Sequence, residues 1–114
     1  MKKNLSLMLT FSIFSIVSTA YAQEWYNGGT LHKADGNEWY AASYANKLAT
    51  AGDFSAVYIG IDNLSSMDEL KAYAINLVTC LDEFYGGVGV AERSANPAAQ
   101  SSALCMVLMG YPQK

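Results

Sequence analysis

The sequence predicts an all-α fold: a compact four-helix domain with one intramolecular disulfide, placed after a cleaved signal peptide. Three observations support this prediction. Apolar residues recur every three or four positions along most of the chain after residue 35, which is the spacing of helices that bury one face. Helix start and stop signals border these stretches. Only two cysteines are present, Cys80 and Cys105.

The first 22 residues have the composition of a secretory signal peptide. Met1-Lys2-Lys3 precedes a moderately apolar stretch from Leu5 to Val17, and Ala20-Tyr21-Ala22 supplies small residues for cleavage. The apolar stretch is shorter than the roughly 20 residues that a membrane-spanning helix needs. We therefore expect residues 1–22 to be removed and residues 23–114 to form a single helical domain in the periplasm.

The exported part of the chain is acidic. Five basic and ten acidic residues follow Ala22, so its net charge is −5. Nucleic-acid phosphates and anionic lipid headgroups repel such a surface. We therefore expect neither nucleic acid nor a membrane as a partner, and a partner with a basic face is slightly favoured.

The two cysteines are expected to form a disulfide. An exported chain meets an oxidising environment, where a pair of cysteines normally closes. A crosslink between Cys80 and Cys105 would close a loop of about 25 residues, worth ~3 to 4 kcal/mol in the chain-entropy model. With His32 as the only histidine, the cysteines do not provide the four ligands of a structural zinc site. No metal or cofactor is expected.

The first two helices are predicted from residue 36 onward, after an irregular, turn-rich lead-in. Asp35 and Glu38 fit a capping box that begins a helix from about Gly36 to Ala49, with Trp39 at one end of its buried stripe. A second start signal at residues 50–53 predicts a short helix that ends between Gly60 and Asn63.

An alternative remains open for part of the second predicted helix. Residues 57–61 also fit a strand, because a short apolar run does not determine the period. No second strand is evident for this run to pair with.

The third helix is predicted from Met67 to about Tyr85. Ser66 and Glu69 match a capping box, and Gly86-Gly87 ends the helix. Apolar residues recur along it at three- and four-residue spacing: Leu70, Ala74, Leu77, Leu81 and Phe84.

The last helix is predicted to follow a flexible connection at residues 88–95. Asn96 is expected to cap it, with Pro97 in its first turn and Met109 at its end. The third and fourth helices would then form an antiparallel hairpin clamped by the disulfide.

No group of side chains has the pattern of a catalytic site. His32 lies in the lead-in, where a surface or capping role is expected. Adjacent carboxylates such as Asp82-Glu83 point about 100° apart on a helix, so they do not converge on one reacting atom. The Gly86–Gly89 stretch lacks the preceding strand and the lysine of a phosphate-binding loop. We therefore predict a protein without enzymatic activity.

The predicted partner-binding surface is the connection between the last two helices. Gly86, Gly87 and Gly89 would allow it to enter a cleft, and helices joined by a disulfide would hold both of its ends. Tyr85 is predicted to supply buried contact area, and Glu92 to complement a basic site on another exported protein.

Four segments resemble the small periplasmic immunity proteins of type VI secretion systems, the Rap/Tai group: Gly36-Asn37-Glu38-Trp39, Tyr58 to Asp62, the helix holding Cys80, and Pro97 to Pro112. The resemblance covers nearly all of residues 23–114. It implies a compact helical domain with an intramolecular disulfide that binds and blocks a cell-wall-degrading amidase delivered by neighbouring cells. Many members carry a cysteine where residues 41–43 stand here.

A competing resemblance is to the small acid-activated chaperones, which are periplasmic stress proteins with helices and one disulfide. Such proteins use many titrating carboxylates and few aromatic residues to unfold and bind clients. The exported part of this chain is rich in tryptophan and tyrosine. This composition favours a stably folded binding protein.

Overall fold

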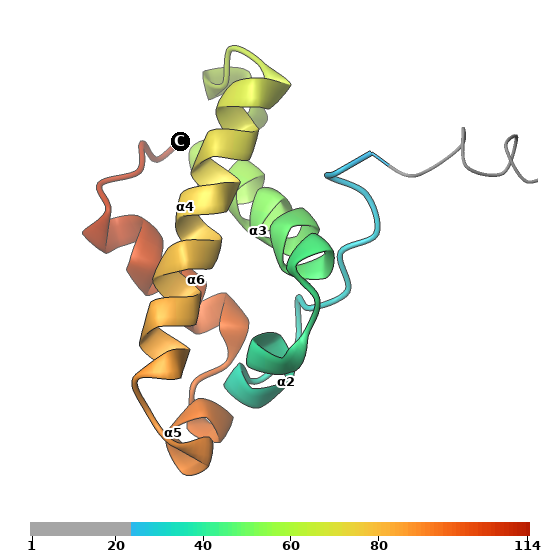
Figure 1. Cartoon of the computed structure of the whole chain (residues 1–114). Coiled ribbons are helices and arrows are strands. Elements are labelled where there is room, and N and C mark those ends of the chain that lie inside the picture. The colour runs from blue at the N-terminus through green and yellow to red at the C-terminus, as the bar shows by residue number, and fades with distance from the viewer. Residues whose placement is uncertain (1–23) are drawn as a thin grey trace, which may run out of the picture.

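The computed structural model describes residues 24–114 (Figure 1). The predicted signal peptide therefore lies outside the described residues. No strand is present in residues 24–114, so the all-α prediction is confirmed. The helices of this part of the chain are α2 (Gly36–Ala41), α3 (Tyr44–Ile59), the 3-10 turn η1 (Ile61–Asn63), α4 (Met67–Gly86), α5 (Val90–Ala95) and α6 (Ala98–Leu108).

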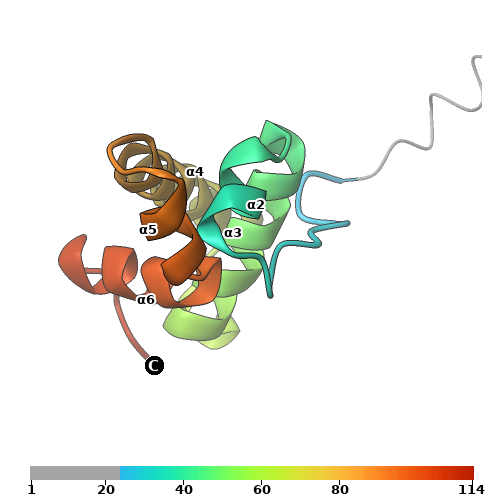
Figure 2. The ribbon, with the colours of Figure 1, turned by 90° about the horizontal axis from the view of Figure 1, so that it is seen from below.

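Three helices make up the body of the domain. α3 and α4 pack along one another, and the chain reverses direction between them (Figure 1). α6 packs against both, and in the view from below it lies next to α3 (Figure 2). The short helices α2 and α5 lie together at the end of the molecule where α4 terminates.

The core lies between these helices. Its largest fully buried side chains include Trp39, Tyr85, Ile59, Leu77 and Leu81. Since burying one large apolar side chain contributes about 1.5 to 3 kcal/mol, these five residues hold α2, α3 and α4 together.

The first predicted helix is in fact two helices. The Asp35–Glu38 capping box is present, with each side chain accepting from the other residue's backbone N–H at 2.9 Å. However, Ala42 is extended (φ −76°, ψ 162°), and Ser43 accepts from the Asn46 N–H at 3.2 Å to begin α3. A serine cap without a glutamate three residues later gave too weak a signal to separate the two helices in the sequence.

The second predicted helix start was also wrong, because α3 continues through residues 50–53 without a break. Gly52 is buried there beside Trp25, whose ring would lie 2.9 Å from an added Cβ. This glycine therefore allows close packing and does not end a helix.

The strand alternative for residues 57–61 is wrong too. α3 runs to Ile59 and ends at Gly60, which has a φ of 89°.

The third helix agrees with its prediction and ends one residue later. Ser66 Oγ accepts from the Glu69 N–H at 3.1 Å. The Glu69 carboxylate accepts from the backbone N–H of Ser65 at 2.6 Å and not from that of Ser66. The hydrogen bonds from the Ser65 backbone and hydroxyl hold the pKa of Glu69 below its ordinary value of 4.5. Phe84 is only half-buried, and Tyr85 completes the buried stripe.

The connection before the last helix is ordered. Residues 90–95 form α5, whereas the sequence predicted a flexible segment. Asn96 does not cap α6: its side-chain amide donates backwards to the Glu92 carbonyl at 2.7 Å, and Pro97 occupies the N-cap position without a side-chain hydrogen bond. The Cys80–Cys105 disulfide, with a Cα–Cα distance of 6.2 Å, joins α4 to α6 and is confirmed.

Candidate protein-binding surface

The surface predicted from sequence lies at the end of the molecule where α4 terminates (Figure 1). We call residues 86–95 the α5 end. It comprises the last residue of α4, the turn at residues 87–89 and α5 itself. All of its residues except Val88 and Arg93 are exposed.

Arg93 holds the turn in place. Its Nη1 donates to the carbonyl oxygens of Tyr85 at 2.9 Å and Val88 at 2.8 Å, and its Nε donates to Asn37 Oδ1 at 2.8 Å. The guanidinium also lies over the Tyr40 ring, 5.0 Å from its centroid. Because these partners come from α2, the end of α4 and the turn, one side chain joins three segments.

The α2 helix supports α5 through a second contact. Asn37 Nδ2 donates to the Val90 carbonyl at 3.1 Å, while Asn37 Oδ1 accepts from Arg93. Both ends of one amide are therefore used to position α5. The backbone of the exposed α5 end is thus held in place by contacts with α2.

Tyr85 does not belong to the exposed surface. Its side chain is fully buried and its hydroxyl donates to the Asn96 carbonyl at 2.7 Å. Burial raises the pKa of Tyr85 above its ordinary value of 10.0. The prediction that Tyr85 supplies contact area to a partner is therefore wrong. The residue completes the core stripe of α4.

The three predicted glycines are exposed but have different structural roles. An added Cβ at Gly86 would lie 3.2 Å from the Tyr40 hydroxyl, whereas at Gly87 it would make ordinary contacts of 3.5 Å. At Gly89 it would meet nothing within 4 Å. Gly87 and Gly89 have φ values of −93° and −90°, which any residue adopts. The fold therefore does not require glycine at either position.

Glu92 is exposed on α5, as the sequence predicts for a residue that faces a partner. One of its carboxylate oxygens accepts from Asn96 Nδ2 at 3.2 Å. This contact connects α5 to the groove described below, because Asn96 also lines that groove.

A second exposed surface was not predicted. α6 faces the interior with Ala98, Ser101, Ser102, Cys105 and Met106, and its outer side carries apolar side chains. Leu104 is 58% exposed, Val107 60% and Leu108 73%. We call Leu104, Val107 and Leu108 the α6 face. Its signal was present in the sequence, since residues 103–108 are all apolar and leave no polar side on this half of the helix.

A groove of about 340 Å³ runs between α4 and α6 beside the α6 face. No charged residue lines it. Its lining residues are Cys80, Phe84, Asn96, Gln100, Ser101, Leu104, Cys105 and Leu108.

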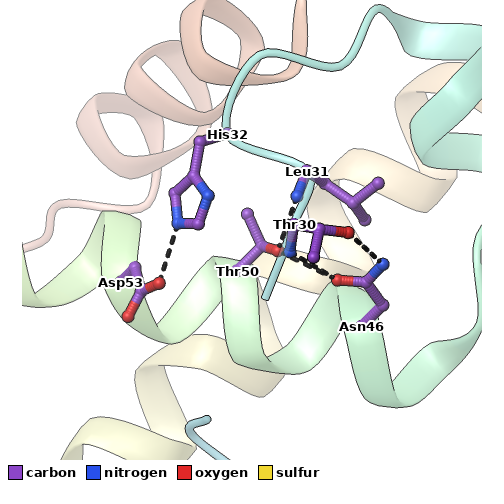
Figure 3. A network of polar contacts seen from close by, with 6 residues as sticks. All are labelled: Thr30, Leu31, His32, Asn46, Thr50 and Asp53. Carbon is purple, nitrogen blue, oxygen red and sulfur yellow. Dashed lines mark hydrogen bonds and ion pairs between the residues drawn. The ribbon is translucent and has the colours of Figure 1, made fainter. Parts of the chain in front are cut away.

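The lead-in forms a polar strap along α3 (Figure 3). Thr30 and Asn46 exchange two hydrogen bonds of 2.8 Å, and the Leu31 N–H donates to Thr50 Oγ1 at 3.2 Å. His32 Nε2 lies 2.7 Å from Asp53 Oδ2. Asn46, Thr50 and Asp53 follow one another at four and three positions, so they lie on one stripe of the helix.

His32 has the surface position expected from the sequence. Its side chain is 44% exposed, and its carboxylate partner Asp53 is 48% exposed. The ring also packs edge-on against Phe54, with the centroids 5.7 Å apart. Through these two contacts, His32 fastens the strap to α3.

In residues 24–114 no group of three or more histidine, cysteine, aspartate or glutamate side chains is arranged to hold a metal ion. None of the helices in the described part of the chain is long and apolar enough to cross a membrane.

Comparisons with protein-family models, with curated proteins and with solved structures gave no match to this chain.

Proposed function

We propose that this protein is an exported binding module that acts by stoichiometric binding to another exported protein through the α5 end. The observation that carries the proposal is the Arg93 network, which holds an exposed turn in one conformation. A turn ordered in advance loses little conformational freedom when a partner binds. Gly87 and Gly89, which the fold does not need, leave room for close approach of that partner.

The proposed compartment is the periplasm. A Cys80–Cys105 disulfide suits an oxidising environment and is uncommon in a reducing cytoplasm. It agrees with the signal peptide expected at residues 1–22.

The proposed partner is a cell-wall amidase delivered by a type VI secretion system, so that the protein serves as its immunity factor. The resemblance to the Rap/Tai group suggests this class. A helical domain with an intramolecular disulfide is compatible with it. The exposed Glu92 beside a glycine-containing turn would suit a cleft with a basic group at its rim.

The test is calorimetric titration of the mature protein against a type VI-delivered cell-wall amidase from its own host, combined with an assay of cell-wall hydrolysis. We expect one-to-one binding and loss of hydrolysis. Gly89→Trp is expected to weaken binding about 100-fold, and Glu92→Lys to weaken it about tenfold. Gly89→Ala is the matched control and should bind nearly as well as the wild type, because its Cβ meets open space.

Two results would count against the proposal. Unchanged affinity of both Gly89→Trp and Glu92→Lys would reject the α5 end as the surface. Binding without inhibition of hydrolysis would reject the immunity role while leaving the binding role intact.

A further inference from the structure

The side of α6 that faces outward is more apolar than the side that faces the core. Ser101 and Ser102 are buried, and the Ser102 hydroxyl has no hydrogen-bond partner, whereas Leu104 and Leu108 are exposed. The exposed leucines lose the free energy that their burial would provide. The buried serine hydroxyls lose hydration, which is costly where no hydrogen bond replaces it. A helix with this arrangement is stabilised when another surface covers its outer side.

We propose that the α6 face and its groove bind an apolar, uncharged helix or loop of the same exported protein that contacts the α5 end. This inference rests on the proposed function and extends it. The occupant is defined by its chemistry: apolar side chains to cover the α6 face, and no charged group opposite the groove.

The charge distribution determines this chemistry. No aspartate, glutamate, lysine, arginine or histidine occurs from Ser94 to Gln113, although the exported chain carries a net charge of −5. A charged segment placed here would lose hydration without gaining a counter-ion. The α5 end provides a carboxylate, Glu92, whereas the α6 face provides apolar contact alone.

The two surfaces are continuous. Asn96 donates to the Glu92 carboxylate at 3.2 Å and also lines the groove, which extends past Gln100 to Leu104 and Leu108. Gln100, Leu104 and Leu108 lie four positions apart, so their side chains form one row along α6. A partner seated against Glu92 therefore meets the start of this row.

The size of the α6 face favours this occupant over a second copy that packs its α6 against this α6 alone. α6 has 11 residues, and a helix of that length spans about 16 Å. Specific stable interfaces bury about 800 Å² on each partner, which is a large area for one short helix to supply. A partner that also contacts the α5 end draws on residues 86–108 and not on one short helix alone.

The experiment places a photo-crosslinking amino acid, benzoylphenylalanine, at Leu108 or at Val90 of the full-length precursor, which is expressed in its own host. Val90 is 67% exposed on α5 and reports on the proposed function. We expect both positions to give an adduct with the same exported protein, identified by mass spectrometry. The outward-facing Ala72 of α4 is the control position and should give no such adduct.

A second arm tests the chemistry of the occupant. Adding Leu104→Glu to the Leu108 probe should reduce the adduct at least about tenfold, and Leu104→Met should leave it nearly unchanged. Leu104 is more than half exposed, so neither change should alter the circular dichroism spectrum or the disulfide, and both are measured as controls.

The outcomes separate the inference from the proposed function. An adduct at Val90 without one at Leu108, or adducts with two different proteins, overturns the inference and leaves the function standing. An adduct at Leu108 with the mass of two copies of this chain assigns the α6 face to self-association and also overturns it. The absence of adducts at both positions rejects the function and the inference together.

Discussion

At the scale of single residues, Arg93 matters most for the candidate surface. Its guanidinium satisfies two carbonyl oxygens and one side-chain amide from separate segments. A lysine has a single charged group without the planar fork, so it cannot serve these acceptors together. The conformation of an exposed turn therefore depends on one half-buried side chain.

We predict that Arg93→Lys lowers the free energy of unfolding by about 1 to 2 kcal/mol and loosens the α5 end. Urea unfolding measures the first effect, and amide hydrogen exchange at residues 87–95 measures the second. Ser94→Lys, on an exposed neighbour, is the matched control and should change neither. Equal protection of the turn in wild type and Arg93→Lys would show that the guanidinium does not order it.

A second prediction concerns Tyr85, which the structure places in the core. Tyr85→Ala should lower the free energy of unfolding by about 3 to 5 kcal/mol because it leaves a large cavity. Tyr85→Phe should cost only about 1 kcal/mol, the value of its hydrogen bond to the Asn96 carbonyl. Thermal or urea unfolding of the two variants provides the comparison, and equal costs would contradict the packing role.

A third prediction concerns Tyr111 and alkaline pH. The Tyr111 hydroxyl donates to the Tyr73 carbonyl, and burial together with the neighbouring Tyr73 raises the pKa of Tyr111 from 10.0 to about 12. A raised pKa means that the folded state holds the proton more tightly. The stabilisation is therefore complete below pH 10 and is lost as the pH rises toward about 12.

The measurement is the free energy of unfolding between pH 9 and pH 12, from urea titrations. We expect a fall on the order of 1 to 3 kcal/mol that is attributable to this residue. Tyr111→Phe should start about 1 kcal/mol lower and show a smaller fall. If its alkaline decline equals that of the wild type, another group is responsible.

At the scale of helices, the long periodic helix could be predicted from the sequence, whereas the break between two short helices and the order of α5 could not. α4 was predictable because a cap, a long apolar stripe and a glycine stop agree on its limits. The break at Ala42 and Ser43 was not, since six residues of α2 carry too few apolar positions to show a separate period. α5 escaped prediction because its order comes from Arg93 and Asn37, which are distant in sequence.

The candidate site was predicted in part. The exposed positions of the glycines and Glu92 agree with the sequence analysis, because a turn that follows a helix stop lies at the surface. The burial of Tyr85 depends on α2, whose Gly36 packs against its ring. Such a contact between two helices cannot be inferred from the periodicity of either one alone.

A fourth prediction tests this helix contact. A Cβ added at Gly36 would lie 2.4 Å from Tyr85 Cε1 and 2.5 Å from the Arg93 carbonyl oxygen. The helix propensity of alanine favours Gly36→Ala by at most about 1 kcal/mol, whereas overpacking costs typically about 1 to 3 kcal/mol. We expect net destabilisation in urea unfolding. Gly89→Ala, where nothing lies within 4 Å, is the control and should cost less than Gly36→Ala, although alanine is a poorer N-cap for α5 than glycine.

At the scale of the whole molecule, the disulfide joins two helices that are otherwise held unequally. α4 contributes a long apolar stripe to the core, whereas the buried side of α6 includes two serines. The hydrophobic contribution to docking is therefore smaller for α6. The crosslink between Cys80 and Cys105 offsets the weaker hydrophobic docking of α6. It limits how far α6 can separate from α4 in the unfolded chain and so lowers the entropy of that state.

A fifth prediction follows for the variant in which Cys80→Ala and Cys105→Ala are combined. Its free energy of unfolding should fall by about 3 to 4 kcal/mol, with the helical circular dichroism signature retained. Urea unfolding with and without reductant measures this: the reductant should destabilise the wild type and leave the variant unaffected. An unchanged midpoint in the variant would mean that the crosslink is not a structural staple.

The position of the α5 end within the crosslinked loop also affects how the protein responds to proteolysis. The disulfide closes a covalent ring that starts at Cys80 and ends at Cys105, and the whole α5 end lies inside this ring. A protease that cuts once between the exposed residues Val90 and Ala91 opens the ring, but both pieces stay attached through the sulfur bridge. The α5 end can therefore be cleaved at exposed residues without the two pieces losing their covalent link, and only a reductant would break that link to the fragment that carries α6.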